Sequence, residues 1–176
     1  GYVAQEQSFY GYMTAAALAR FVRGFYPTWD EAEWRRVTRL LELPLDVVID
    51  NMSGGTRVKV ALGLALAHRP ELLLLDEPTA GLDPVARREF LEIVRDDHRA
   101  HGRTTFFSTH LVDEIELIAP RLAVIDAGRT AFEGEVTSLR DRVRRLTLSV
   151  ADDRHPDALV AEVRTALAAA SVRIAS

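Results

Sequence analysis

LLLLDEPTAGLDP, residues 72–84, is the stretch of sequence that decides the fold. It begins with a short, continuous apolar run, and that run ends in two adjacent acids, Asp76 and Glu77. Such a run is typical of a central parallel strand whose two faces are both covered. We therefore expect a buried strand over Leu72–Leu75, with the two acids at the mouth of a parallel sheet.

A well-marked helix and a second strand follow this stretch. Asp83 is a favourable N-cap, Pro84 suits the first helical position, and Gly102 is expected to end the helix. Arg103–Ser108 then reads as a strand, and His110 lies just past its carboxyl end. Because strand and helix alternate here, the pattern predicts an α/β fold with a largely parallel sheet.

The first third of the chain is expected to be mostly helical. Apolar residues recur at helical spacing in Met13–Tyr26, and Pro27 stops that run. Asp30 reads as the N-cap of the next helix, with Glu33 completing a capping box. A helix rich in small residues follows over Arg57–His68.

The remaining pattern carries less information. A helix is expected near Val112–Ile118, followed by two short strands, and the last segment reads as an unfinished accessory unit. The expected segments after that helix are Leu122–Ile125, Thr130–Phe132, Leu146–Val150 as a strand, Asp157–Ala170 as a helix and Val172–Ile174 as the start of a strand.

Composition narrows the class of protein. The 176 residues are 48% hydrophobic and 27% charged, as in globular domains, and the formal net charge is −4. Charges of both signs are interspersed, which argues against a nucleic-acid-binding face. The absence of cysteine excludes disulfides and thiolate metal sites. No apolar run approaches the roughly 20 residues of a membrane-spanning helix, so a membrane role would need a partner.

Two adjacent acids at a strand end have a plain structural explanation, because a strand often turns into a loop at acidic residues. A nucleotide-hydrolysing site, however, needs two such groups with different tasks. Asp76 would hold Mg²⁺, directly or through water, and Glu77 would point toward the water that attacks the γ-phosphate. The apolar-then-acidic pattern alone leaves both interpretations open.

The continuation of this stretch favours the catalytic interpretation. Residues 72–84 resemble the Walker B strand and following loop of the ATP-binding cassette family. The resemblance extends from about Gly1 to Leu139 and implies a P-loop NTPase fold, with part of a RecA-like core and a helical subdomain. The implied divisions are a Q-loop segment at 1–12, the helical subdomain at 13–51, the signature helix and core at 52–140, and an accessory segment at 141–176.

Residues 52–56, Met-Ser-Gly-Gly-Thr, resemble the signature of this family, although Thr56 stands where glutamine is usual and Met52 where leucine is usual. Backbone amides, a helix dipole and a serine hydroxyl would together favour a phosphate there. Taken alone, the motif would be a flexible turn. In the family this element closes over ATP held by the partner subunit. The resemblance therefore assigns a nucleotide-binding role to Ser53, Gly54, Gly55 and Thr56.

Three further residues acquire roles through the resemblance. His110 matches the switch histidine that contacts the γ-phosphate, and Gln5 matches the glutamine that completes the Mg²⁺ and water shell. Asp83 would link two active sites across a dimer interface, in addition to capping its helix. Without the resemblance, His110 would read as a loop residue and Gln5 as an ordinary polar residue.

The resemblance also implies cofactors and partners. ATP and Mg²⁺ are the expected cofactors, and the partners are a second nucleotide-binding subunit and a membrane-spanning permease on the cytoplasmic face of the membrane. Phe9, Tyr10 and Tyr12 would lie where family members receive the coupling helix of the permease, with core packing as the alternative. Residues 25–30 are similar to those of drug and lipid exporters.

No phosphate-binding loop GxxxxGK[ST] occurs in the sequence, whose single lysine is Lys59. Because neutralisation of phosphate charge is central to this chemistry, these 176 residues alone are expected neither to bind ATP tightly nor to hydrolyse it. The chain reads as an interior sequence cut open. Loss of an N-terminal part is favoured over a natural remnant, because Ser53, Asp76, Glu77 and His110 are all retained.

Two other functions remain open beside the leading expectation, an ATP-hydrolysing transporter subunit. The chain could be a non-catalytic module that completes the ATP site of a partner through Ser53–Thr56 and Asp83. It could also be an ATPase outside transport, as in the DNA-maintenance and ribosome-associated members of the family. No long coiled-coil segment or second cassette supports that last interpretation.

Overall fold

The computed structural model describes the backbone of residues 1–142 and the side chains of residues 1–139. The chain divides into two compact units, Gly1–Ser138 and Leu139–Ser176, and the elements discussed below belong to the first, except that the last helix, Val136–Arg142, continues into the second. The three segments expected after residue 142 lie outside the described residues.

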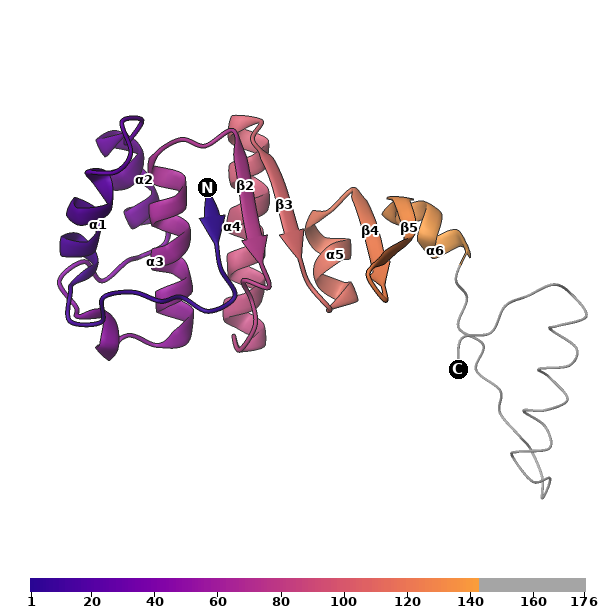
Figure 1. Ribbon diagram of the computed structural model, residues 1–176, viewed down its shortest axis with the longest axis horizontal. Helices are drawn as coiled ribbons and strands as arrows, with labels where there is room; N and C mark the ends of the chain where they lie inside the picture. Colours follow the sequence, from indigo (N-terminus) through magenta and orange to yellow (C-terminus); the bar gives the residue numbers. More distant parts are fainter. Residues whose placement is uncertain (143–176) are drawn as a thin grey trace, which may run out of the picture. The chain divides into compact units, whose positions relative to one another are not determined.

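Three parallel strands form the main sheet, in the order β1-β2-β3. Figure 1 shows their arrowheads pointing the same way. The central position expected for the apolar strand is therefore confirmed. The last residue of β2, Asp76, lies opposite the last residue of β3, Ser108. The strands are β1 (Tyr2–Val3), β2 (Leu72–Asp76) and β3 (Thr104–Ser108).

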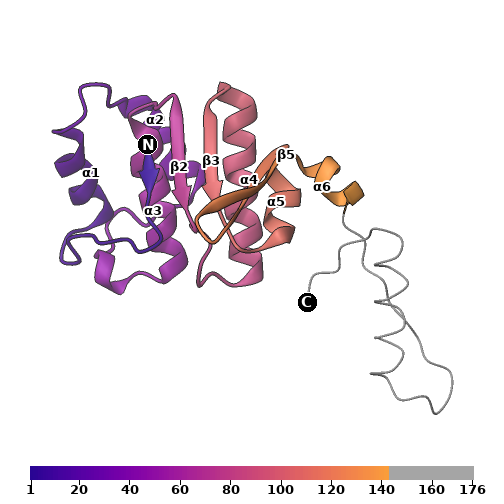
Figure 2. The ribbon, with the colours of Figure 1, turned by 45° about the vertical axis from the view of Figure 1, so that its right-hand side comes forward.

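Two groups of helices pack beside this sheet. In Figures 1 and 2, α3 lies between the sheet and the pair α1 and α2, while α4 lies beside β2 and β3. One apolar core joins α1, α2, α3, β1, β2 and α4. The helices are α1 (Ala15–Arg23), α2 (Glu31–Leu40), the 3₁₀ turn η1 (Ile49–Asn51), α3 (Gly54–Ala67), α4 (Pro84–His101) and α5 (Val112–Ile118).

The N-terminal cap of α2 agrees with the prediction only in part. Asp30 accepts hydrogen bonds from the backbone N–H groups of Ala32 and Glu33, as an N-cap should. The reciprocal half of the capping box is wrong. The N–H of Asp30 donates instead to the carbonyl of Ala67, and the Glu33 carboxylate binds Arg36. A carboxylate gains more from a guanidinium than from an amide, which explains the difference.

The other helix ends follow local chemistry closely. Asp83 caps α4, and Gly102 ends it with φ +63, a conformation that favours glycine. Helix α3 begins at Gly54, three residues before the predicted start at Arg57, because Ser53 acts as its N-cap.

One face of the main sheet is covered within the described residues, and the other is open. Leu73 and Leu75 are buried, whereas the side chains of Leu72 and Leu74 are 45% and 38% exposed. The expectation that both faces are covered is thus wrong for this part of the chain. The alternating burial arises because successive side chains of a strand point to opposite faces, and only one face meets packed helices.

A two-stranded antiparallel sheet follows α5, formed by β4 (Arg121–Asp126) and β5 (Arg129–Glu135). The turn between these strands contains Gly128 at φ +73, where glycine is favoured. Helix α6 (Val136–Arg142) comes next. Among the helices of the described part, none combines the length and the apolar character needed to cross a bilayer.

Candidate functional site

The two acids of the decisive stretch lie at the carboxyl end of β2. Asp76 is the last residue of the strand and is exposed, and Glu77 begins the loop. The backbone of Glu77 has φ +40, in the left-handed region that residues other than glycine rarely adopt. Such strain is often found at functional sites. The chain thus turns sharply between the two carboxylates, and each finds a different partner.

Ser108 joins both acids to the neighbouring strand. Its hydroxyl donates a hydrogen bond of 2.7 Å to Oδ1 of Asp76 and accepts one of 2.9 Å from the backbone N–H of Glu77. The sequence interpretation missed this residue. The register of β2 with β3 could have indicated it, because the last residues of two adjacent parallel strands meet at the same sheet edge.

His110 lies beside Glu77 at this edge. Its Nδ1 is 3.3 Å from Oε2 of Glu77, and its side chain is 67% exposed. The structure therefore brings Asp76, Glu77 and His110 together around Ser108. The oxygen donors of Asp76 and Ser108 are the hard ligands that Mg²⁺ prefers, and Asp76 remains open to solvent, so the residues present fit such an ion.

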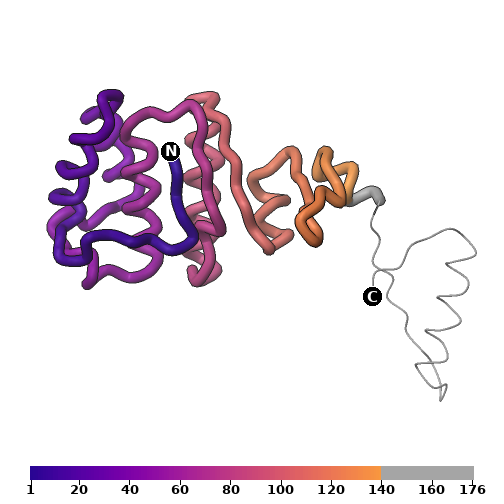
Figure 3. The backbone as a smooth tube through the Cα atoms, viewed as in Figure 1, coloured from indigo at the N-terminus to yellow at the C-terminus, as the bar shows by residue number. Residues whose placement is uncertain are grey.

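Gln5 follows β1 and reaches the same sheet edge. Val3 lies opposite Leu75, so the next residues leave the sheet where β2 ends. Figure 3 shows this segment crossing from the sheet to α1 along that end. The carbonyl of Gln5 accepts a hydrogen bond from Gln7. Within the described residues, no hydrogen bond joins the Gln5 side chain to Asp76 or Glu77.

Ser53 and the glycines after it form the N-terminus of α3, at the end of the molecule where the strands finish (Figure 1). Oγ of Ser53 accepts a hydrogen bond of 3.1 Å from the N–H of Thr56. A Cβ added at Gly54 would meet open space, whereas one at Gly55 would lie 3.5 Å from Leu82. The start of α3 therefore packs beside the loop that precedes α4 and leaves Gly54 accessible.

Asp83 ends that loop as the exposed N-cap of α4. Oδ1 accepts hydrogen bonds of 3.0 Å from the N–H groups of both Val85 and Ala86. The hydrogen bond from Ala86, followed by that from Val85, holds the pKa of Asp83 below its usual value. The carboxylate is therefore charged at the surface, as both capping and contact with a partner would require.

A buried acid that sequence reasoning also missed lies behind this edge. Glu114, on α5, is 1% exposed and binds Thr79 and Thr109. Its position on a short helix after His110 gave no signal, because acids in the first turn of a helix are ordinary. One of the partners that make it unusual, Thr79, lies 35 residues away in the sequence.

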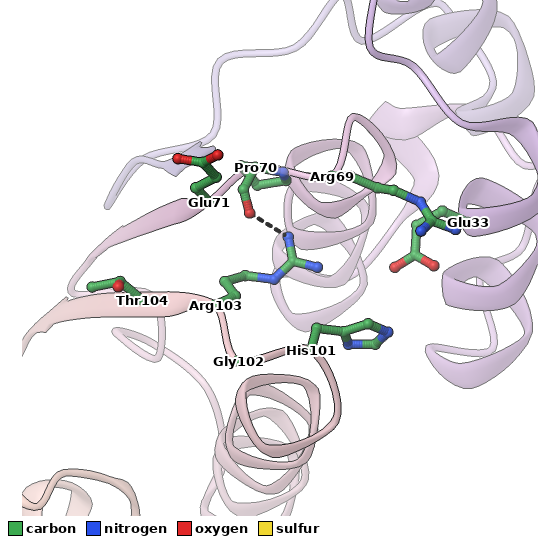
Figure 4. Close-up of a pocket in the computed structure, with 8 residues that line it drawn as sticks. All are labelled: Glu33, Arg69, Pro70, Glu71, His101, Gly102, Arg103 and Thr104. Atoms are coloured by element: carbon green, nitrogen blue, oxygen red, sulfur yellow. Dashed lines mark hydrogen bonds between the residues drawn. The ribbon is translucent and has the colours of Figure 1, made fainter.

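A second charged cluster lies at the opposite, amino end of β2 and β3. It borders a pocket of about 390 Å³, in which Arg103 donates a hydrogen bond to the carbonyl of Pro70 (Figure 4). Glu33, Asp97 and His101 come close enough there to suggest a metal site. The two carboxylates, however, already bind Arg36 and Arg103, so the cluster is accounted for as an ion-pair network. The pocket is lined by Glu33, Arg69, Pro70, Glu71, His101, Gly102, Arg103 and Thr104.

The single lysine has a structural partner. Nζ of Lys59 lies 2.9 Å from Oε2 of Glu89 and joins α3 to α4. This ion pair explains the residue without any phosphate.

Comparisons with known proteins identify the family of the chain. The family profile "AAA domain, putative AbiEii toxin, Type IV TA system" matches residues 39–116, which include Ser53, Asp76, Glu77, Asp83 and His110. The chain is 34% identical over 147 residues to mouse (Mus musculus) ATP-binding cassette sub-family A member 9, covering 81% of this chain and 9% of that protein. It is 38% identical over 124 residues to the Nod factor export ATP-binding protein I of Neorhizobium galegae, covering 70% of this chain and 35% of that protein.

A solved structure supports the fold. The chain matches cbiO1 from Clostridium perfringens, described as part of the ABC transporter complex cbiONQ, with a TM-score of 0.69 and 24% identity. The match covers 80% of this chain and 59% of that one. The chain spans less than half the length of the two curated relatives above. The sequence likeness, the shared fold and the order of the strand-edge residues show that the chain belongs to the ATP-binding cassette family of ATPases.

Proposed function

We propose that this chain supplies the water-activating and metal-holding residues of an ATP-hydrolysing transporter subunit, and a clamp for nucleotide held by a second subunit. The observation that carries the proposal is the grouping of Asp76, Glu77 and His110 around Ser108 at the carboxyl edge of a parallel sheet. In open α/β sheets this edge is where ligands bind.

Each residue of this group has a proposed task that its geometry supports. Glu77 accepts the proton of the attacking water, because its carboxylate is half-buried at the sheet edge beside the His110 ring. His110 orients the Glu77 carboxylate and reaches toward the γ-phosphate from its exposed position. Asp76, fixed by Ser108, would hold Mg²⁺, which would neutralise charge on the phosphates. Gln5 would be a further ligand from the neighbouring strand end.

The proposed clamp is the N-terminus of α3, where Ser53 and Gly54 are exposed. In the described part of the chain, Gly54 has no neighbour that a side chain would touch, so packing there does not explain the glycine. Close approach of a phosphate would explain the glycine, because the N-terminus of α3 offers free backbone N–H groups and the positive end of the helix dipole. Ser53, Gly55 and Thr56 complete this surface, and Asp83 carries a charge on the loop beside it. These features support a second nucleotide-binding subunit as the partner.

Exposed aromatic residues support a permease as the other partner. The ring of Tyr10 contacts those of Tyr12 and Phe21, and Phe21 contacts Phe25. All four side chains are exposed, whereas Phe9 packs against the core. An exposed aromatic patch of this kind suits an apolar helix of a membrane subunit, which would hold the protein on the cytoplasmic face of the membrane.

The proposal is tested with the protein expressed from its complete gene. We expect ATP hydrolysis that Glu77→Gln abolishes, with ATP still bound, because glutamine keeps the shape of the side chain but cannot accept the proton. Glu71→Gln is the matched control, since Glu71 directly precedes the same strand at its other end. Unchanged turnover in Glu77→Gln would refute the assignment of the base.

A third outcome would favour the non-catalytic alternative. In that case the protein shows no hydrolysis alone but stimulates hydrolysis by a complete partner subunit, and Ser53→Ala removes the stimulation while Glu77→Gln does not.

A further inference from the structure

The buried carboxylate of Glu114 joins two loops that flank the candidate site. Oε1 accepts a hydrogen bond of 2.6 Å from the hydroxyl of Thr79, and Oε2 accepts one of 2.5 Å from the hydroxyl of Thr109. Nε of Arg87 lies 3.4 Å from Oε1. Three segments that are separate in sequence, the loop after β2, the loop after β3 and helix α4, therefore meet at one side chain.

The buried carboxylate of Glu114 needs each of its three partners. A buried carboxylate is costly unless hydrogen bonds and a counter-charge compensate it. Glu114 is 1% exposed and Thr79 is also buried, so water cannot replace a lost partner easily. Nε of Arg87 is also buried and makes no hydrogen bond among the described residues, so its ion pair with Glu114 supplies the counter-charge. The energetic penalty for moving any one segment away from Glu114 is therefore large.

The two threonines are adjacent to the residues that the proposed chemistry uses. Thr79 lies two residues after Glu77, and the amide of Leu82 donates a hydrogen bond to its carbonyl. Thr109 directly precedes His110, and its hydroxyl accepts a hydrogen bond from the amide of Leu111. Fixing Thr79 and Thr109 on one carboxylate fixes the spacing between Glu77 and His110.

We infer that Glu114 is a positioning residue that couples the loop after Glu77 to the loop that carries His110. The inference rests on the proposed function for its effect on hydrolysis, whereas the mechanical coupling of the loops does not depend on it. Ser108 already ties the two strand ends together, but its hydrogen bonds stop at Asp76 and the backbone of Glu77. Glu114 extends the connection to the loops that follow β2 and β3.

The first test measures coupling without any activity. Hydrogen exchange of the Leu82 amide reports on one loop and that of the Leu111 amide on the other. We expect Thr79→Val to speed exchange at Leu111, and Thr109→Val at Leu82, each by about 2- to 10-fold, the effect of one lost hydrogen bond. Thr79→Ser and Thr109→Ser keep the hydroxyl and should leave the far loop unchanged. Exchange that changes only in the mutated loop would overturn the inference.

The second test measures hydrolysis by the protein expressed from its complete gene. Glu114→Gln keeps one acceptor oxygen but loses the charge and the second acceptor. We expect kcat to fall between about 10- and 100-fold with KM little changed, as expected for misplaced catalytic groups. Glu116→Gln, an exposed acid on the same helix, is the matched control. If Glu114→Gln fails to fold, Thr79→Val and its serine counterpart replace it.

The outcomes separate the two claims. Coupled exchange in a protein that hydrolyses no ATP would sink the proposed function and leave the positioning role of Glu114 in the fold intact. Hydrolysis that the Glu114 and threonine variants leave unchanged would overturn the positioning role and leave the proposed function intact.

Discussion

The hydroxyl of Ser108 donates a hydrogen bond of 2.7 Å to Oδ1 of Asp76, which joins the last residue of β3 to the last residue of β2. The same oxygen accepts a hydrogen bond from the N–H of Glu77. One small side chain thus orients the carboxylate that we propose as a Mg²⁺ ligand and holds the strained turn at Glu77. The neighbouring Asp76 carboxylate keeps its other oxygen available.

Replacing Ser108 with alanine should therefore damage the site more than the fold. Losing both hydrogen bonds leaves Asp76 free to rotate and the N–H of Glu77 without its partner, so we expect at least a roughly tenfold fall in kcat. The measurement is steady-state hydrolysis by the protein from its complete gene. Thr104→Ala, an exposed site at the other end of β3, is the control. Equal rates in Ser108→Ala and Thr104→Ala would contradict the prediction.

The contrast between Asp76 and Ser108 shows what the sequence could predict. Asp76 follows an apolar run that has few other interpretations, so both the strand and its acidic end were foreseen. Ser108 has meaning only through the register of β2 with β3, and register depends on how far each strand extends along the other. The same limit applies to Glu114, whose partners lie 35 and 5 residues away.

The helix ends followed the sequence wherever the decisive contacts were local. Asp83 and Gly102 act within one turn of α4, and both were predicted. Glu33 was assigned to a local capping box, but Arg36 binds its carboxylate and the N–H of Asp30 donates to the distant carbonyl of Ala67. Arg36 is itself held by Asp97, which lies 61 residues further on. A contact of that range leaves no trace in the spacing of residues near Asp30.

His68 should make the stability of the protein depend on pH near neutrality. Its ring stacks on Tyr26 at a centroid distance of 4.3 Å, and burial lowers its pKa from the ordinary value of 6.5. The folded state therefore favours the neutral ring. Its contribution to stability is fully present above pH 6.5 and is lost as the pH falls through the lower pKa of the folded state.

The comparison that isolates this effect is between the wild-type protein and His68→Phe. Phenylalanine keeps the stack on Tyr26 and cannot bind a proton. Urea denaturation at pH values between 7.5 and about 5 should show the wild type losing stability relative to the variant as the pH falls. Parallel pH profiles would show that His68 does not carry the dependence, since every other histidine is common to both proteins.

The ion-pair network around Asp97 should be the most sensitive point of the fold outside the apolar core. Nε of Arg103 lies 2.8 Å from Oδ2 of Asp97, and both side chains are buried. Arg36 reaches the other carboxylate oxygen from α2, so this network links α2 to α4 and to the residue before β3. Arg103→Met removes one of the two guanidinium groups and leaves a buried charge partly compensated. We expect a loss of about 3 kcal/mol in the free energy of unfolding.

Two comparisons separate this effect from a simple loss of charge. Arg88 forms an exposed pair with Glu92 at 3.1 Å, and Arg88→Met should cost less than about 1 kcal/mol. The double variant Arg103→Met, Asp97→Leu removes the buried carboxylate itself and leaves Arg36 paired with Glu33. We therefore expect this double variant to be more stable than Arg103→Met alone in urea denaturation at pH 7. If it is less stable, the cost of Arg103→Met comes from lost packing and not from an uncompensated charge on Asp97.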